Sequence, residues 1–274
     1  MKEELYGYSL FMYGYFPPMY KYVRLIQTSL VFAKRDISSR YLGSVLGPLW
    51  VIISPVAAAS ITTMVFSLVF RHASEGIPYF FVVLSGFLSW GFFSGSLAHA
   101  TRSLVANRHI ILAHKFPLAA PIVGAIIGRI ADYLVILIFL LILLTFFGHS
   151  VSLIMVLFLP LVLILQLALQ IGLGLMTAVL NAYYRDIQNF VDVLLQLLFY
   201  ATPILYPLSA VPHPWRIFIQ LHPMALAVEA TRAILLSSRI PGRELFFLSA
   251  WAFLALIVGI LLFKKLVRRL PDVI

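Results

Sequence analysis

The sequence predicts an all-α, multi-pass membrane protein, and three observations support this prediction. Of the 274 residues, 62% are hydrophobic and only 11% are charged, and the mean hydropathy is +1.01. A soluble domain of this size needs a largely polar surface, which so few charges could not supply. Several apolar runs also reach the length of about 20 residues that a helix needs to cross a hydrocarbon core of roughly 30 Å. We therefore expect a single transmembrane domain over residues 1–274.

Six apolar segments are long enough to cross the membrane as helices. The predicted spans cover residues 49–70, 80–103, 117–147, 151–180, 187–206 and 244–263. The third and fourth are longer than a bilayer requires, which predicts helices that tilt or project beyond it. The spans form a six-span region over residues 49–263, which is followed by a cytoplasmic tail over residues 264–274.

The segment between the fifth and sixth spans, residues 207–241, differs from the rest. It is only half apolar, and Pro207, Pro212, Pro214 and Pro223 interrupt it. It is too broken to span the membrane and too apolar to be a free loop. This pattern favours a pair of short re-entrant or interfacial helices.

Residues 21–41 predict an amphipathic helix that lies along the membrane surface before the first span. The apolar residues at helical spacing are Val23, Ile26, Leu30, Ala33, Ile37 and Tyr41. Basic side chains occupy the rest of the helix surface, so we expect it in the cytoplasmic headgroup layer, near anionic lipid phosphates. Gly43 to Pro48 then form a corner, and Trp50 anchors the first span at the interface.

The distribution of Lys and Arg predicts the orientation in the membrane. Six spans place both termini on one side, and fourteen of the 20 basic residues fall on that side. Arg129 lies within a span, and the opposite side holds the remaining five: Arg71, Arg216, Arg232, Arg239 and Arg243. Cytoplasmic loops carry the excess of basic residues, so both termini are predicted to be cytoplasmic.

Few charged residues fall within the predicted spans. Arg129 and Asp132 lie in the third span and Asp192 in the fifth. Each costs about 2.5–3.5 kcal/mol near the bilayer centre, so each needs a partner or water. Arg129 and Asp132 are three residues apart and can pair on one helix face, a packing role we favour over a transport role. Asp192 is expected to meet Arg185 or solvent.

The same spacing recurs in Glu229 and Arg232, and pairing is again the expected arrangement. Small residues four positions apart, such as Gly124 and Gly128, permit close helix contact. That contact is possible within one subunit or between subunits, and packing within the chain is the favoured alternative.

Aromatic residues are dense around the fifth predicted span. They are Tyr183, Tyr184, Phe190, Phe199, Tyr200 and Tyr206, with Gln188 and Gln196 on the same segment. Sugars bind to flat aromatic faces combined with amide hydrogen bonds, so this pattern suits a carbohydrate path. An aromatic belt at the membrane interfaces, with Phe facing lipid, explains the same residues equally well.

Several kinds of chemistry lack the residues they need. The chain has no cysteine, which excludes disulfides and thiolate sites. It also has no phosphate-binding loop, and its seven histidines do not cluster with carboxylates at metal-ligand spacing. We therefore expect no catalytic residues, no metal and no cofactor in this chain. The net charge of +10 indicates membrane topology and attraction to lipids, not nucleic-acid binding.

Three segments, taken together and in this order, resemble a known family. They are "AKRDISSRYLGSVLGPLWVIISPV", "NRHIILAHKFPLAAPIV" and "NAYYRDIQNFVDVLLQLLFYATPILYPLSAVP". They resemble the membrane subunit of polysaccharide ABC exporters, the type-2 exporter permeases that move O-antigen, teichoic acid and related capsular glycans. The most specific pieces are Arg40-Tyr41, Leu46-Gly47-Pro48-Leu49-Trp50, Lys115-Phe116-Pro117, Tyr184-Arg185-Asp186, and Pro203-Ile204 with Tyr206-Pro207. The match extends from about residue 33 to the sixth span.

The resemblance implies partners as well as a fold. It implies a homodimer of this chain with two copies of a cytoplasmic ABC ATPase, which binds the ATP and Mg²⁺. In such permeases the interfacial helix and the loop after the second span dock on the ATPase. The matching positions here are Arg35, Asp36, Arg40, Asn107, Arg108, His109 and Lys115.

The resemblance also implies a substrate path. The first and fifth spans line the channel in this family, and the matching aromatic residues are Trp50, Tyr183, Tyr184, Phe190, Phe199 and Tyr200. The broken segment 207–241 corresponds to helices that gate the external side. There Arg216, with Arg232 or Arg239 and near Glu229, is a candidate for contact with a lipid pyrophosphate or an anionic sugar.

We therefore expect ATP-driven export of a lipid-linked polysaccharide across the bacterial cytoplasmic membrane, with no covalent chemistry in this chain. Two alternatives stay within transport. One is a type-2 ABC exporter for lipids or drugs, and the other is an ion-coupled secondary carrier, which would need inverted repeats and more paired acids within the membrane. A membrane enzyme acting on isoprenoid or phospholipid substrates would need clustered metal-binding residues.

Overall fold

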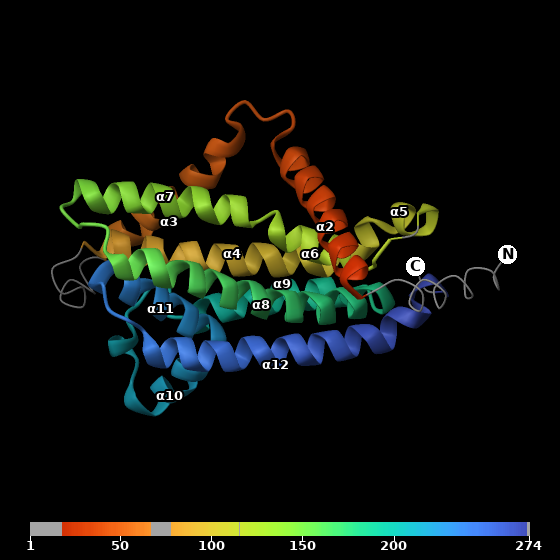
Figure 1. The fold of residues 1–274 in the computed structure, drawn as a ribbon. Coiled ribbons are helices and arrows are strands. Elements are labelled where there is room, and N and C mark those ends of the chain that lie inside the picture. The colour runs from red at the N-terminus through yellow and green to blue at the C-terminus, as the bar shows by residue number, and fades with distance from the viewer. Residues whose placement is uncertain (1–17, 67–77, 115, 273–274) are drawn as a thin grey trace.

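The structure is a computed structural model that describes residues 18–66, 78–114 and 116–272. Within these ranges every regular element is a helix, and the long helices run side by side as a bundle (Figure 1). The predicted all-α class is therefore confirmed. Lys115, one of the predicted docking residues, lies outside the described residues.

Helix α2 (Pro18–Tyr41) is the predicted amphipathic helix, and it begins slightly earlier than expected. The turn after α2 contains Gly43 and Gly47, whose φ values of +76° and +47° lie in the left-handed region that glycine adopts without strain. The short helix η1 (Gly47–Leu49) and helix α3 (Trp50–Phe66) follow. Figure 1 shows α2 inclined to the bundle and lying beside α6.

Helix α4 (Tyr79–Ala106) is the central helix of the bundle. It contacts α3, α6, α7, α8, α9 and α11. About two thirds (67%) of its most apolar window is buried inside the protein, compared with 6% for α3. A helix that is surrounded by others needs apolar or small residues on every side, which explains why such residues occur all round α4. Asn107 ends α4, and helix α5 (Arg108–Ala113) follows at once.

The third predicted span is two helices, α6 (Ala120–Ile127) and α7 (Ile130–Phe146), which divide at Gly128 and Arg129. Helix α2 crosses α6 at Gly124. A Cβ atom there would lie 2.7 Å from the Ser29 carbonyl oxygen, so only glycine permits the crossing. The glycine pair therefore serves packing within the chain, as the sequence favoured.

Helices α8 (Leu153–Tyr183) and α12 (Gly242–Leu266) form the longest helix contact. Gly172 of α8 and Gly259 of α12 face each other, and a Cβ atom on either would overlap the backbone of the other helix. Close approach of this kind maximises dispersion contacts in a lipid environment, where burial of apolar surface supplies little force between helices. The short helix η3 (Val267–Asp272) continues from α12 into the tail.

The fifth predicted span, residues 187–206, is only partly helical. Helix α9 (Asp186–Ala201) has 16 residues. It ends just before Pro203, which cannot donate the backbone hydrogen bond that a continuing helix requires. The helix is therefore shorter than the roughly 20 residues that a span needs.

Two helices lie between α9 and α12, after the short η2 (Leu208–Ala210). Helix α10 (His213–Leu221) has no buried residue, whereas α11 (Pro223–Ser237) is almost entirely buried. Figure 1 places α10 and α11 toward one end of the bundle, and α5 and the last turns of α12 toward the other. We call these the α11 end and the α5 end.

Among the described residues, five stretches are long and apolar enough to cross a membrane. They are Gly47–Phe66, Tyr79–Ala106, Ala120–Phe146, Leu153–Tyr183 and Gly242–Leu266. The protein is thus a multi-pass membrane protein. A sixth span is not confirmed, because α9 is shorter than the other five.

Candidate functional site

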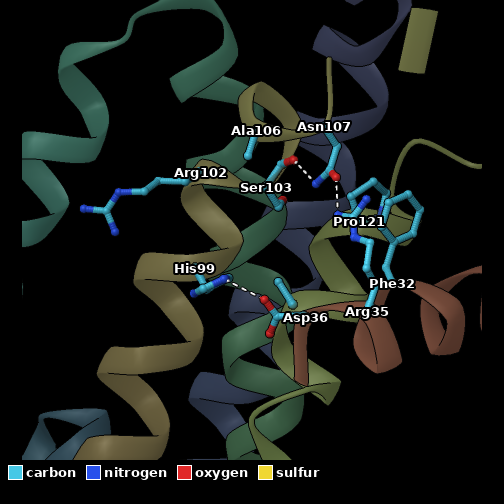
Figure 2. Close-up of a pocket in the computed structure, with 10 residues that line it drawn as sticks. Phe32, Arg35, Asp36, His99, Arg102, Ser103, Ala106, Asn107 and Pro121 are labelled. Carbon is cyan, nitrogen blue, oxygen red and sulfur yellow. Dashed lines mark hydrogen bonds and ion pairs between the residues drawn. The ribbon is translucent and has the colours of Figure 1, made fainter. Parts of the chain in front are cut away.

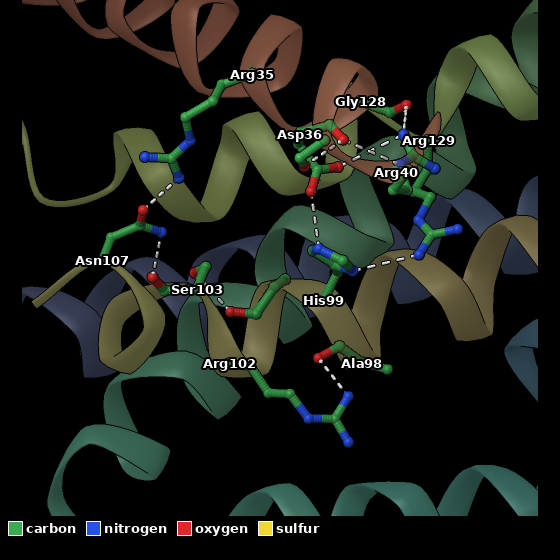
Figure 3. Close-up of polar contacts among 12 residues, drawn as sticks. Arg35, Asp36, Arg40, Ala98, His99, Arg102, Ser103, Asn107, Gly128 and Arg129 are labelled. Carbon is green, nitrogen blue, oxygen red and sulfur yellow. Dashed lines mark hydrogen bonds and ion pairs between the residues drawn. The ribbon is translucent and has the colours of Figure 1, made fainter. Parts of the chain in front are cut away.

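A network of charged residues joins α2 to the bundle near the α5 end (Figure 3). Arg40 of α2 donates hydrogen bonds to the Asp132 carboxylate at the start of α7 and, at 2.6 Å, to the Gly128 carbonyl oxygen. Tyr41 donates to the other Asp132 oxygen at 2.8 Å. Residues 40 and 132 are 92 positions apart, so this contact ties the start of the chain to its middle.

The network continues to α4 through His99. Its Nε2 atom lies 2.8 Å from Asp36 Oδ1, and its Nδ1 atom lies 3.2 Å from Arg129 Nη2. A guanidinium can only donate, so Nδ1 accepts and the imidazole carries its proton on Nε2, which donates to Asp36. We call Asp36, Arg40, Tyr41, His99, Arg129 and Asp132 the α2 network.

The sequence predicted that Arg129 and Asp132 pair with each other. Their charged atoms lie 3.4 Å apart, so this ion pair is present. The Asp132 carboxylate nevertheless has closer partners in Arg40 and Tyr41 of α2. The pair is therefore one part of a joint between helices, which periodicity within one segment could not reveal.

The surroundings shift the pKa values of two α2 residues. Burial alone would raise the pKa of the Asp36 carboxyl, but the hydrogen bond from His99 and the neighbouring positive charges hold it below its ordinary value. Burial and the hydrogen bond to Asp132 raise the pKa of the Tyr41 hydroxyl to about 12. Asp36 therefore stays ionised and Tyr41 stays protonated across the physiological range.

A second contact between α2 and α4 lies closer to the α5 end. Arg35 donates to the side-chain oxygen of Asn107, and Asn107 in turn donates to the Ser103 carbonyl oxygen at 2.7 Å. Between this contact and the His99–Asp36 contact lies a cavity of about 280 Å³ (Figure 2). Its wall combines apolar residues such as Phe32 and Pro121 with charged and polar residues such as Asp36 and His99.

The predicted docking residues therefore fall into two groups. Arg35, Asp36, Arg40 and Asn107 have partners within the chain, and the Asn107 residue is only 8% exposed. Arg108 and His109, by contrast, are exposed on α5, which has no buried residue. The exposed Arg108 and His109 side chains can contact another protein directly. The contacts of the first group join α2 to α4 and α7, and Arg35 of this group is itself also exposed.

The sequence left two surroundings open for Asp192 of α9, Arg185 or solvent. Its side chain is 37% exposed and so reaches solvent, and it does not pair with Arg185. Its carboxylate accepts a hydrogen bond from Arg102 of α4, which is 90 positions away. Arg185 precedes the first turn of α9 and is exposed. The pairing follows from the side-by-side packing of α4 and α9, which sequence spacing does not encode.

The predicted aromatic lining is divided between two surroundings. Trp50, Tyr184, Phe190 and Tyr200 are exposed by 52%, 66%, 63% and 70%. Tyr183 instead points toward the end of α12, where its hydroxyl donates to the Leu266 carbonyl oxygen at 2.8 Å. The exposed face of α9 is thus aromatic and aliphatic, and its opposite face, with Val191 and Leu195, is buried.

Phe199 lies at the edge of a groove between α4 and α9 that sequence reasoning missed. The groove holds about 400 Å³ and is lined by Trp90, Ser94, Leu195, Gln196, Phe199 and Tyr200. The Phe199 ring lies 5.9 Å from that of Trp90 and 5.3 Å from that of Tyr200, centroid to centroid. The groove thus combines aromatic faces with an amide and a hydroxyl. The i, i+4 spacing of Trp90 and Ser94 on one helix face was the signal in the sequence that could have identified it.

Arg232 of α11 is a buried cation near the α11 end, with only 7% of its surface exposed. Its guanidinium donates to the carbonyl oxygens of Pro203, Ile204 and Val82 at 2.5, 2.6 and 3.0 Å. It also donates to Glu229 at 3.0 Å, which is the pairing expected from the sequence. Its donors are therefore directed at the chain itself, and we call this set the Arg232 clamp.

The other two arginines of the predicted gate are placed differently. Arg216 on α10 donates to the Val211 carbonyl oxygen at 3.0 Å. The Arg239 side chain is 65% exposed and lies 3.6 Å from Glu244. Within the described residues, no group of three or more His, Cys, Asp or Glu is arranged to hold a metal ion.

Comparison with known proteins gives a consistent result. The sequence profile described as "ABC-2 type transporter" matches residues 27–236. The O-antigen export system permease protein RfbA of Klebsiella pneumoniae is 27% identical over 250 residues, which is 91% of this chain and 96% of that protein. The protein of the same name from Myxococcus xanthus is 30% identical, over 82% of this chain and 85% of its own length.

A third relative, the polysialic acid transport protein KpsM of Escherichia coli, is 22% identical over 84% of this chain and 90% of its own length. The region matched by the sequence profile includes most of α2 and all of the α2 network, the groove and the Arg232 clamp. These matches cover well over half of the chain. The chain belongs to the ABC-2 type transporter family.

Proposed function

We propose that this chain is the transmembrane subunit of an ATP-driven exporter that moves a lipid-linked polysaccharide of O-antigen type across the bacterial cytoplasmic membrane. The observation that carries the proposal is the similarity to an O-antigen export permease over 91% of this chain and 96% of that relative. Similarity over nearly the full length of both chains indicates the same arrangement of helices, and therefore a comparable substrate path.

The face of α9 and the groove beside it provide the proposed path. Phe190 and Tyr200 are exposed on α9, and Trp90 and Phe199 form the aromatic wall of the groove, with Gln196 nearby. Sugars bind by stacking on aromatic faces while amides satisfy their hydroxyls, which fits a polymer passing along α9. In this proposal α9 and the segment up to Tyr206 line the channel together with Trp50 of α3, and the belt interpretation is the competing explanation.

The chain works with partners in this proposal. Two copies form the channel, and two copies of a separate ABC ATPase bind ATP and Mg²⁺ on the cytoplasmic side, where both termini lie. Exposed Arg108 and His109 of α5, together with Lys115, contact the ATPase. Arg35, Asp36, Arg40 and Asn107 connect the docked elements to α4 and α7.

The α11 end forms the external gate in this proposal. Glu229 and Arg232 hold the broken segment after α9 in place, because the Arg232 guanidinium is directed at its carbonyl oxygens. Arg239, whose side chain is 65% exposed, and Arg216 of α10 are the gate arginines that we assign to an anionic substrate group such as a lipid pyrophosphate. An exporter of lipids or drugs is the nearest alternative, and it would leave the aromatic groove without a sugar to bind.

Affinity purification from mildly solubilised native membranes tests the function. We expect the tagged chain to copurify with an equal amount of an ABC ATPase whose ATP turnover rises when lipid-linked polysaccharide is added. Copurification with turnover stimulated by drugs or phospholipids alone would support the alternative exporter. A pure chain without an ATPase partner would contradict both and favour a secondary carrier, to be tested first at Asp132 and Asp192.

A further inference from the structure

The last turns of α4 contact two different neighbours. On one side, His99 contacts Asp36 and Asn107 contacts Arg35, and both partners lie on α2. Figure 3 shows Arg102 extending away from these two contacts. On that other side it pairs with Asp192 of α9. The end of α4 therefore lies between the interfacial helix and α9, and it continues directly into α5.

The Arg102–Asp192 pair and the aromatic groove lie along the same line of contact between α4 and α9, which we call the seam. Trp90, Ser94, Ala98 and Arg102 are four residues apart and share one face of α4. On α9, Asp192 and Gln196 have the same spacing. The Trp90 and Phe199 rings make contact at one end of the seam, and the ion pair closes the other. The described residues contain no other ion pair that involves α9.

The seam is packed on its buried side and open on its exposed side. Val191 and Leu195 of α9 belong to one buried apolar cluster with Phe93 of α4. The groove of about 400 Å³ opens beside this cluster, between Ser94 on α4 and Gln196 on α9. The apolar contacts hold the two helices together, and the ion pair adds a charged contact whose attraction weakens as its two groups separate. The ion pair therefore helps to set how the two helices lie beside the groove.

We propose that Arg102 and Asp192 are positioning residues that transmit movement from the docking elements, α2 and α5, to α9 and the groove beside it. The inference rests on the proposed export function and adds the mechanical link between ATPase and channel. When the end of α4 moves with α2 and α5, Arg102 carries Asp192 and hence α9 with it. Without the pair, α9 follows the movement of α4 less closely.

A charge-swap series in the assembled permease–ATPase complex tests the link. The variants are R102E, D192R and the double variant R102E/D192R, and both ATP turnover and polysaccharide export are measured. We expect each single variant to assemble and to hydrolyse ATP while export per ATP falls up to about fivefold, the loss expected when an ion pair whose side chains are 43% and 37% exposed is broken. The double variant is expected to recover most of that export, because it restores the pair with its charges exchanged.

Arg185 offers a matched control, because it is an exposed arginine just before the same helix. R185E alone is expected to export as the unchanged complex does, and R185E/D192R is expected not to recover. The neutral double variant R102Q/D192N avoids an unpaired charge. It is expected to assemble normally and yet show the reduced export per ATP, which a role in stability alone would not produce.

Two results would overturn the link. One is normal export per ATP in R102Q/D192N, and the other is a swap variant that recovers nothing while its complex assembles. Parallel loss of assembly and export in every variant, the swap included, would also overturn it, by showing that the pair serves only packing. A failure of the proposed function is a different result, because the unchanged complex itself would then export no polysaccharide.

Discussion

Two arginines of this protein are both held by partners within the chain, yet their surroundings differ in kind. Arg232 lies near the α11 end, and most of its partners are backbone carbonyl oxygens. Arg40 lies in the α2 network, where it contacts the carboxylates of Asp132 and Asp36 and the Gly128 carbonyl oxygen. The first arrangement fastens the backbone of α4 and of the segment after α9, whereas the second also joins carboxylates that have other donors.

The difference lies in what can rearrange. A carbonyl oxygen moves only when its backbone moves, so the Arg232 clamp opens only when α11 moves relative to α4 or to the segment after α9. A carboxylate in the α2 network has several donors within reach, because Asp132 accepts from Arg40, Tyr41 and Arg129. Hydrogen bonds can be exchanged there without leaving a charge unpaired. We infer a fixed clamp at one end and an adjustable joint at the other.

The largest expected effect comes from removing the clamp. Arg232→Gln removes the buried guanidinium that donates hydrogen bonds to Glu229 and to three carbonyl oxygens. Breaking a buried pair on one side costs about 3–5 kcal/mol, so we expect much less assembled protein and a clearly lower unfolding temperature in detergent. An unchanged unfolding temperature would show that the clamp does not hold the segment.

A smaller and more local effect is expected at the joint. Asp132→Asn keeps the shape of the side chain and removes the charge that Arg40 and Tyr41 share, at a cost of about 1–3 kcal/mol. Amide hydrogen exchange should rise in α2 and stay unchanged in α11. Tyr41→Phe removes one of the hydrogen bonds and should give a lesser increase in the same helix. Faster exchange in α11 would contradict the separation of the two regions.

Acid should weaken the joint through Asp36. The pKa of this carboxyl in the folded protein lies below its unfolded value of about 3.9. Its stabilising contribution is therefore complete above the unfolded pKa and is lost as the pH falls through the folded pKa. The unfolding temperature, measured from pH 7 downward, should fall as this contribution is lost. Asp36→Asn should have a lower unfolding temperature at pH 7 and a smaller fall with acid. If the unfolding temperatures of both proteins fell equally, a group other than Asp36 would be responsible.

The smallest effect is expected at Arg239, which offers a contrast to Arg232 near the same end of the bundle. Its side chain is 65% exposed and 3.6 Å from Glu244. Exposed ion pairs contribute roughly 0–1 kcal/mol, so Arg239→Gln should leave the unfolding temperature nearly unchanged. A loss as large as that of Arg232→Gln would show that exposure does not separate these two arginines.

Much of the fold could be predicted from the sequence. The apolar runs located α3, α4, α8 and α12, and helical periodicity located the amphipathic α2, because these patterns are local. The boundaries of α9 were less accessible. The apolar run continues past Ala201, but Pro203 and the contacts from Arg232 turn the chain out of the helix, and those contacts come from a segment 28 or 29 residues away.

Only part of the candidate site could be predicted from the sequence. The exposed aromatic residues of α9 and the exposed Arg108 and His109 of α5 were found because their residue types stand out within short segments. Trp90 and Ser94 were missed because they read as ordinary members of an apolar span. Only the packing of α4 against α9 makes them one wall of a groove.

The sequence by itself determined that this protein is helical, spans the membrane several times and belongs to an ABC-2 type transporter family. Hydrocarbon permits few spanning structures, so composition and run length are sufficient for the first two conclusions. Only the tertiary structure decided which charges meet. Asp132 pairs with Arg40 and Asp192 with Arg102, across 92 and 90 positions, because the pairing depends on how neighbouring helices are rotated and aligned. Local periodicity defines a face of one helix, and the neighbouring helix decides what that face contacts.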